Sequence, residues 1–226
     1  MFVYILMGGI FILSLVVQNS LKSKFNKYSK VPLGVPMAGR DIAAAMLQQN
    51  GCGDVKVTSV SGQLTDHFNP ANKTVNLSEP VYGTNSIAAA AVAAHECGHA
   101  VQHKVGYSML QLRTKMVPVV SFASKTVQWL LLAGIAVYEM TALPLYIALA
   151  MFAATVLFSF VTLPVEVDAS RRAIKWLEGS GIVGGEQLNY AKDALHAAAY
   201  TYVVAAIGSL ATLIYYAAVF LGGNRR

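Results

Sequence analysis

The sequence predicts a mainly α-helical membrane protein with about four transmembrane helices and a small cytoplasmic α+β element. Composition supports this fold class, because 55% of the 226 residues are hydrophobic and only 12% are charged. Soluble domains carry about 25% charged residues, so the deficit is typical of a chain that crosses a bilayer. The apolar residues also gather in four long runs, and β-branched alternation is confined to one polar segment between them.

The first apolar run covers residues 2–17 and is expected to be an anchor rather than a cleaved signal peptide. No basic residues precede it, no small-residue cleavage site follows it, and its lysines come after it. The other runs cover 117–138, 141–163 and 200–221, each long enough for a hydrocarbon core of about 30 Å. Lys125 interrupts the second run, where its side chain either extends toward the interface or faces protein.

The distribution of basic residues predicts which segments lie in the cytoplasm. Residues 18–116 hold ten Lys and Arg and residues 164–199 hold four, whereas the link between the second and third runs has only Glu139. By the positive-inside rule both basic segments are cytoplasmic. Arg225 and Arg226 would then lie outside, against the rule, but the larger asymmetry outweighs them. The net charge of +6 is therefore expected to reflect membrane sidedness, and no nucleic-acid partner is expected.

These observations divide the chain into five segments. They are an N-terminal transmembrane anchor (1–20), a cytoplasmic region (21–116), a transmembrane hairpin (117–163), a cytoplasmic helical segment (164–199) and a C-terminal transmembrane helix with its tail (200–226). Each boundary falls where an apolar run gives way to polar sequence.

The first cytoplasmic region is expected to hold the α+β element. Residues 37–50 read as an amphipathic helix, and alternation at 55–60 and 73–78 predicts two strands of a small antiparallel sheet. A further helix is expected from the N-cap candidates at 84–86 to about Lys104. The free edge of the strand before this helix could hold an extended peptide. The alternative is a strand that only packs on the helix.

This helix carries the pattern H-E-x-x-H at His95, Glu96 and His99. Residues four apart on an α-helix differ by about 40° around its axis, so the two imidazoles point the same way. They can bind one Zn²⁺, and Glu96 is then placed to act as a general base. The alternative, two ordinary core or surface histidines, fits the helix-forming context less well. Cys52 and Cys97 form no C-x-x-C pair, and Cys97 is expected to face away and pack.

A hydrolytic zinc site needs a third protein ligand and one open position. His103 lies two turns beyond His95, too far to complete the site on a straight helix, and is expected to serve at an interface or to support a ligand. Glu166 is the better candidate, because it follows the third apolar run on the same side as His95. Pro164 is expected to start or kink a helix there. The alternatives for Glu166 are a solvated helix end and an ion pair with a following arginine.

Five stretches within residues 34–208 resemble the bacterial YugP-like family of neutral zinc metallopeptidases of the inner membrane. They are LTDHFNP (64–70), KTVNLSE (73–79), AAHECGHAVQ (93–102), LPVEVDASRR (163–172) and AAAYTYV (197–203). This family is similar to the integral-membrane gluzincins. The resemblance implies a zincin-like element with His95 and His99 as metal ligands, Glu96 as the base and Glu166 as the third ligand.

The sequence departs from the gluzincin pattern beside the third ligand. Membrane gluzincins commonly have an acidic residue four positions after the ligand glutamate, and this chain has Ser170 there. Asp168 lies two residues after Glu166 instead. The residue that supports the ligands from outside the metal centre is therefore left open.

The resemblance predicts a zinc-dependent metalloendopeptidase of the bacterial inner membrane, with its active site on the cytoplasmic side. Zn²⁺ is the expected cofactor, activating a water molecule that Glu96 deprotonates. A peptide or protein substrate and the lipid bilayer are the expected partners. The alternatives are a catalytically inactive zinc-binding scaffold and a transporter. A transporter is expected to have more spans or internal repeats, and the sequence shows neither. A structural zinc site is expected to have four protein ligands, and the sequence offers three.

Five further residues are candidates for roles around the reacting bond. Tyr202, His196 and Tyr200, near the start of the last run, could stabilise a developing oxyanion, with Tyr202 favoured. An aromatic residue at the membrane interface is the alternative. His67 and Asp66 could contact substrate or orient a ligand, and the alternative for both is turn stabilisation.

Overall fold

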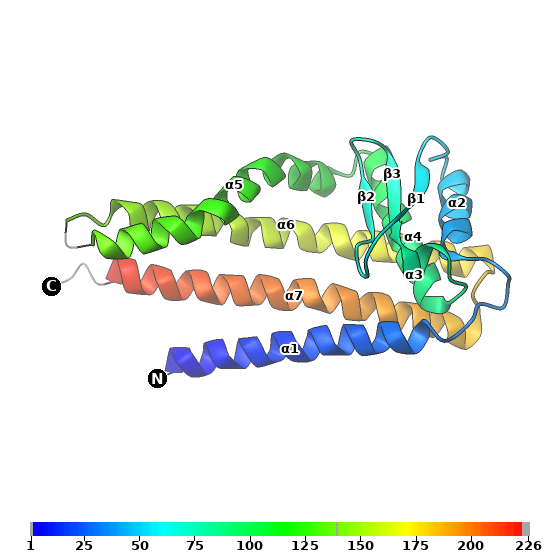
Figure 1. Cartoon of the computed structure of the whole chain (residues 1–226), viewed down its shortest axis with the longest axis horizontal. Helices are drawn as coiled ribbons and strands as arrows, with labels where there is room; N and C mark the ends of the chain where they lie inside the picture. The colour runs from blue at the N-terminus through cyan, green and yellow to red at the C-terminus, as the bar shows by residue number, and fades with distance from the viewer. Residues whose placement is uncertain (1, 139, 223–226) are drawn as a thin grey trace. The chain divides into compact units, whose positions relative to one another are not determined.

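The computed structural model describes residues 2–138 and 140–222 (Figure 1). Its elements are α1 (Phe2–Tyr28), α2 (Gly39–Gln49), β1 (Lys56–Val60), β2 (His67–Asn69), β3 (Thr74–Ser78), α3 (Glu79–Tyr82), α4 (Ile87–Lys104), α5 (Ser108–Ala136), α6 (Leu143–Ser180) and α7 (Gly185–Gly222). This order confirms the predicted mainly helical class with a small α+β element. Glu139, Arg225 and Arg226, which bear on the predicted membrane sidedness, lie outside the described residues.

The chain forms two compact units. Unit 1 consists of Met1–Val16, Gln111–Leu163 and Tyr202–Arg226, and unit 2 consists of Val17–Leu110 and Pro164–Thr201. All three strands and helices α2, α3 and α4 belong to unit 2, whereas α1, α5, α6 and α7 contribute residues to both units.

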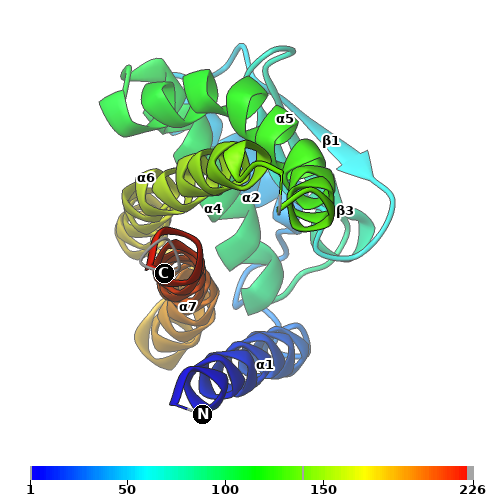
Figure 2. The same ribbon diagram turned by 90° about the vertical axis from the view of Figure 1, so that its left-hand side faces the viewer.

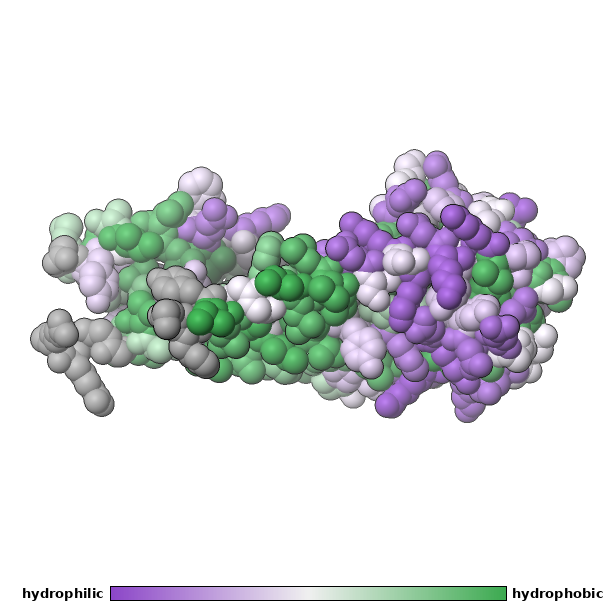
Figure 3. Space-filling view, turned by 90° about the horizontal axis from the view of Figure 1, so that it is seen from below, coloured by the Kyte–Doolittle hydropathy of each residue, from purple (hydrophilic) through white to green (hydrophobic). Residues whose placement is uncertain are grey.

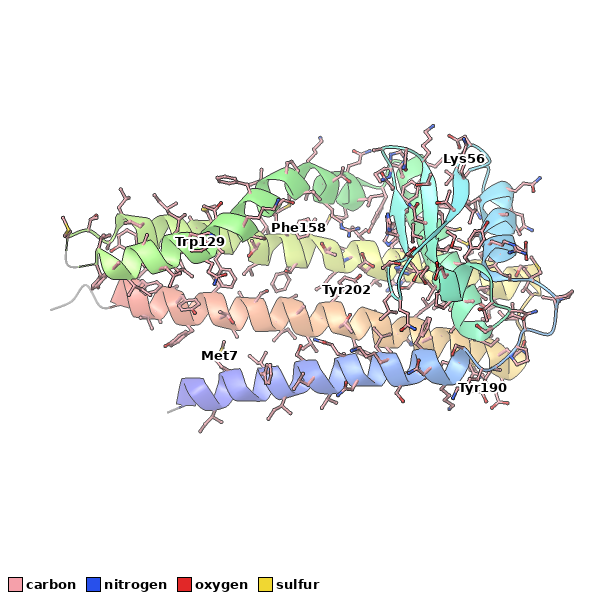
Figure 4. The ribbon with its side chains drawn as sticks, in the orientation of Figure 1. Met7, Lys56, Trp129, Phe158, Tyr190 and Tyr202 are labelled. Atoms are coloured by element: carbon pink, nitrogen blue, oxygen red, sulfur yellow. The ribbon has the colours of Figure 1, made fainter. Side chains whose placement is uncertain are left out.

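Four helices are long and apolar enough to cross a membrane, as the four apolar runs predicted. They are α1, α5, α6 and α7. In unit 1 they pack through small residues, since a Cβ on Gly134 would meet Leu145 and one on Gly208 would meet Ile10. Figure 2 shows α1, α7 and α6 following one another around this unit. Its surface is mainly apolar (Figure 3), and Trp129, labelled in Figure 4, is 71% exposed. Such a surface fits lipid as its solvent.

All four of these helices extend beyond the apolar runs that revealed them. Helix α6 continues through Pro164 to Ser180, so of the two expectations for this proline the helix start is wrong, and a kink stays a prediction. An internal proline removes one backbone hydrogen bond, at a cost of about 3 kcal/mol. Val165, Ala169 and Ala173 follow at four-residue spacing with 0% exposure, and burial of this stripe favours an uninterrupted helix.

Helices α1 and α7 are joined in unit 2 by polar and aromatic contacts. The Lys24 ammonium lies 2.6 Å from a carboxylate oxygen of Asp193, and the Tyr28 hydroxyl donates to the other oxygen at 2.7 Å. The rings of Tyr28 and Tyr190 stack with centroids 5.0 Å apart (Figure 4). Asp193 therefore satisfies two groups of α1 and fixes the register of the two helices.

The sheet differs from the small antiparallel sheet that the alternation suggested. Its strand order is β1-β3-β2, with β1 parallel to β3 and β2 antiparallel to β3. The segment between the two predicted strands contains β2 itself, a three-residue strand that turn residues obscured. Strand β3 is thus central and has no free edge, so a peptide cannot pair with it. Alternation reports which residues are buried, but it carries no information on strand direction.

Helix α4 is the central element of unit 2. It begins at Ile87, with the Ser86 hydroxyl accepting a hydrogen bond from the Ala89 N–H at 3.2 Å, as the N-cap candidates predicted. Its alanine-rich surface contacts α2, α3, β2 and β3. Cys97 is fully buried, with its sulfur 3.5 Å from the Ala43 carbonyl oxygen of α2, which confirms that it packs away from the histidines.

Gly98 allows the close approach of α4 and α6, and we predict that Gly98→Ala destabilises the protein. A Cβ at this position would lie 2.6 Å from the Ala169 carbonyl oxygen, so the helices would have to separate. Overpacking of this kind costs about 1–3 kcal/mol, more than the helix propensity gained. Thermal unfolding in detergent measures the effect. Gly179→Ala is the matched control, since nothing lies within 4 Å of its added Cβ. Equal stability of the two variants would contradict the close approach.

Candidate metal centre

Three side chains from α4 and α6 converge inside unit 2. His95, His99 and Glu166 each offer a ligand atom, and these atoms all lie within 4.8 Å of one another. The Nε2 atoms of His95 and His99 lie 3.2 Å and 3.6 Å from the same Glu166 oxygen, Oε2. The structure thus brings together the three residues that the sequence proposed as ligands.

The local sequence explains this convergence. Four-residue spacing places both imidazoles on one face of α4, with their rings 4.8 Å apart and nearly perpendicular. Glu166 reaches them because α6 passes Gly98 at backbone distance. The solvated helix end is not met, since the Glu166 side chain is only 4% exposed, and Arg172 pairs instead with Asp168.

The three donors fit a zinc ion in type and spacing. Two imidazoles and one carboxylate form a common ligand set of catalytic zinc sites. Ligands about 2.0–2.1 Å from a tetrahedral ion lie about 3.3 Å from one another. The observed nitrogen–oxygen separations of 3.2 Å and 3.6 Å are close to that value. Three donors leave one tetrahedral position for a water or substrate atom.

The outward-facing ring nitrogens also have partners. His95 Nδ1 lies 3.1 Å from the Ser170 hydroxyl, and His99 Nδ1 lies 3.0 Å from the Gln102 side-chain oxygen. Ser170 thus occupies the supporting position at which gluzincins commonly have an acid. The sequence reasoning did not assign a role to Gln102. Its position three residues after His99, on the same helix face, was the available signal.

Glu96 is buried beside this cluster, with 8% of its surface exposed. Burial raises the pKa of Glu96 to about 7. The charge of His95 and a hydrogen bond from the Phe68 backbone N–H oppose the shift, whereas the carboxylates of Glu166 and Asp66 add to it. A carboxyl group with a pKa near 7 can both accept and return a proton close to neutral pH.

The other candidate residues have different surroundings. Asp66 accepts hydrogen bonds from the Ser78 backbone and hydroxyl at 2.7 Å and 3.0 Å, so it contacts the end of β3 rather than a residue of its own turn. His67 is exposed, with Nδ1 2.8 Å from the Thr65 carbonyl oxygen. The ring of His103 packs against Phe68 at 5.7 Å, outside the ligand cluster.

The candidates for oxyanion stabilisation lie on α7. His196 and Tyr200 are exposed residues of unit 2 outside the cluster of ligand atoms. Tyr202 belongs to unit 1 and is 37% exposed (Figure 4). An oxyanion role for Tyr202 stays a prediction.

Comparison with known proteins places these residues in a family. A family model described as "Putative neutral zinc metallopeptidase" matches residues 3–221. A relative from Bacillus subtilis (strain 168), "Putative membrane protease YugP", is 43% identical over 212 residues, which cover 94% of this chain and 93% of the relative. No solved structure matches the chain. These findings confirm the resemblance inferred from the five sequence stretches.

The geometry predicts that Glu166→Ala removes zinc from the protein. Loss of the only carboxylate donor leaves two imidazoles, and we expect zinc affinity to fall by about 100-fold or more. Metal analysis of the purified chain and competition with a coloured chelator measure the change. Glu178→Ala is the control, because this glutamate lies on the same helix and is 60% exposed. Full zinc occupancy in Glu166→Ala would contradict the assignment of the third ligand.

Proposed function

The chain belongs to the neutral zinc metallopeptidase family, and on this premise we propose that it is a zinc-dependent membrane metalloendopeptidase with Glu96 as its general base. The observation that carries the proposal is the convergence of His95, His99 and Glu166 beside a buried fourth group, Glu96. A purely structural zinc site commonly has four protein ligands, whereas three ligands and an adjacent base favour hydrolysis.

The proposed reaction assigns a separate task to each side chain. His95, His99 and Glu166 would hold Zn²⁺, which supplies Lewis-acid activation of water and of the peptide carbonyl when it is bound. Glu96 accepts a proton from the attacking water and later donates it to the leaving amine. Because Glu96 is shielded from bulk solvent, the proton stays at the reacting bond between these two steps.

Strand β2 is the proposed support for an extended peptide. It is an edge strand of the sheet, and the Phe68 backbone N–H bonds to Glu96. Strand β2 is therefore next to the proposed base. A peptide paired with this edge would pass the reacting groups in an extended conformation, independent of its side chains.

The site is proposed to act at the cytoplasmic face of the inner membrane. The basic residues of segments 18–116 and 164–199 support this sidedness, since both segments carry the excess of Lys and Arg expected inside. His95 and Glu166 come from these two segments, which the hairpin 117–163 connects. We retain the five-segment division, with 21–116 as the catalytic region, as part of this proposal.

Glu96→Gln is expected to separate zinc binding from catalysis. Glutamine keeps the size of the side chain but cannot accept a proton, so cleavage should fall by about 10²–10⁴-fold while zinc remains bound. Digestion of an unfolded protein by the purified chain in detergent, together with metal analysis, tests both parts. Glu178→Gln, a change of an exposed glutamate on α6, should leave both unchanged. Undiminished cleavage by Glu96→Gln would overturn the mechanism, and inactivity of the wild-type chain toward all peptides would favour a scaffold.

Zinc removal is expected to lower stability as well as activity. A ligand at about 100 times its Kd stabilises the folded state by about 2.7 kcal/mol, and a chelator should remove this gain. Thermal unfolding with and without zinc measures the difference. Glu96→Gln should keep the zinc-dependent stabilisation, whereas Glu166→Ala should lose it. Stabilisation of Glu166→Ala by zinc equal to that of the wild type would place the metal elsewhere.

A further inference from the structure

Gln102 is a fully buried polar residue outside the proposed set of ligands and base. It lies on α4 and has 0% exposure. Its side-chain oxygen is 3.0 Å from His99 Nδ1, and its nitrogen donates to the Val165 carbonyl oxygen and to Asp168 Oδ2, both at 2.8 Å. All hydrogen-bonding groups of the amide are thus engaged, in a position where an unsatisfied group would be costly.

These contacts fix the orientation of the amide. A carbonyl oxygen and a carboxylate oxygen can only accept, so the two atoms near Val165 and Asp168 require the –NH₂ group of Gln102. The amide oxygen must then face His99, and it too can only accept. His99 therefore carries a proton on Nδ1, and in the neutral ring this leaves the lone pair of Nε2 directed toward Glu166, 3.6 Å away.

Asp168 contacts Gln102 on the side away from His99. It lies two residues after Glu166, about 200° around α6, so it faces away from the ligand cluster. Its Oδ2 accepts from Gln102 and also from the Arg172 Nε at 2.6 Å. Arg172 and Asp168 are 31% and 26% exposed, whereas His99 is 8% exposed. A hydrogen-bonded chain thus runs from a partly solvated ion pair to a buried imidazole.

The second histidine lacks such control. His95 Nδ1 faces the Ser170 hydroxyl, which can either donate or accept, so this contact is compatible with both tautomers. Only His99 has a partner whose polarity is set by other groups.

We propose that Gln102 is a positioning residue that holds His99 as the Nδ1–H tautomer, and that Asp168, paired with Arg172, fixes Gln102. The geometry assigns to a neutral amide the support that metal-binding histidines often receive from a carboxylate. This inference rests on the proposed function in one respect, namely that His99 is a metal ligand.

Nitrogen NMR of the metal-free, full-length chain in detergent tests the tautomer directly. Replacement of His67, His103 and His196 by glutamine leaves the ¹⁵N-labelled signals of His95 and His99, and Ser170→Ala identifies His95 by its shift. We expect His99 to be the Nδ1–H tautomer in this background and to lose that preference in Gln102→Ala. An Nε2–H tautomer of His99 with Gln102 present would overturn the proposal.

Zinc affinity in a double-mutant cycle tests the chain of contacts. Gln102→Ala and Asp168→Ala should each weaken zinc binding, by about 10–100-fold for Gln102→Ala. Because Asp168 acts through Gln102, the double variant should bind zinc no more weakly than Gln102→Ala alone. Ser170 contacts the other histidine, His95, so Asp168→Ala and Ser170→Ala should weaken zinc binding independently. The fold-losses of the two single variants should therefore multiply in the double variant. An undiminished effect of Asp168→Ala in the Gln102→Ala background would contradict the relay, as would unchanged affinity of Gln102→Ala.

Two further measurements separate a hydrogen-bonding role of Asp168 from a steric one, and failure of this proposal from failure of the proposed metal site. Asp168→Asn retains an oxygen that can accept from Gln102, so it should bind zinc more tightly than Asp168→Ala, whereas a purely steric role predicts no such difference. Asp168 is partly exposed, so these variants decide the question even if Gln102→Ala does not fold. Zinc binding that survives Glu166→Ala would defeat the proposed site, while the NMR measurement reads the tautomer without metal.

Discussion

The close contact of α4 with α6 at Gly98 is the constraint on which the proposed metal centre depends. A side chain at this position would meet the Ala169 backbone at 2.6 Å, so the helix axes can approach only because the residue is glycine. Three residues before and one residue after Gly98, α4 presents His95 and His99, and α6 presents Glu166 opposite them. The distances from the imidazoles to the carboxylate are therefore set by backbone packing, which is stiffer than any side chain.

The same contact organises the polar groups around the ligands. Helix α6 supplies the proposed ligand Glu166 and also the hydrogen-bond partners of both histidines, Ser170 for His95 and Asp168 through Gln102 for His99. Each helix thus completes the hydrogen bonds of the other. In a site where unsatisfied polar groups are costly, this mutual dependence favours one arrangement over its neighbours. It also makes metal binding and helix packing parts of the same equilibrium.

Much of this site could be predicted from local sequence, and the failures have physical causes. The spacing of His95 and His99 determines their helix face wherever the helix lies. Gln102 was missed because a buried glutamine has no sequence signature apart from its spacing. Strand β2 was missed because three residues carry too little alternation to distinguish a strand from a turn. Pro164 suggested a helix start or a kink, and the helix does not start there because burial of the residues that follow outweighs the lost hydrogen bond.

The sequence by itself determined the four apolar helices, the H-E-x-x-H pattern on α4 and the family, because these depend on periodicity and composition over short distances. The tertiary structure decided the direction of the strands, the identity of the edge strand and the partners of the ligands. His95 and Glu166 are 71 residues apart, and local periodicity does not extend across such a separation. Only the packing of α4 on α6 brings the two halves of the site to hydrogen-bonding distance.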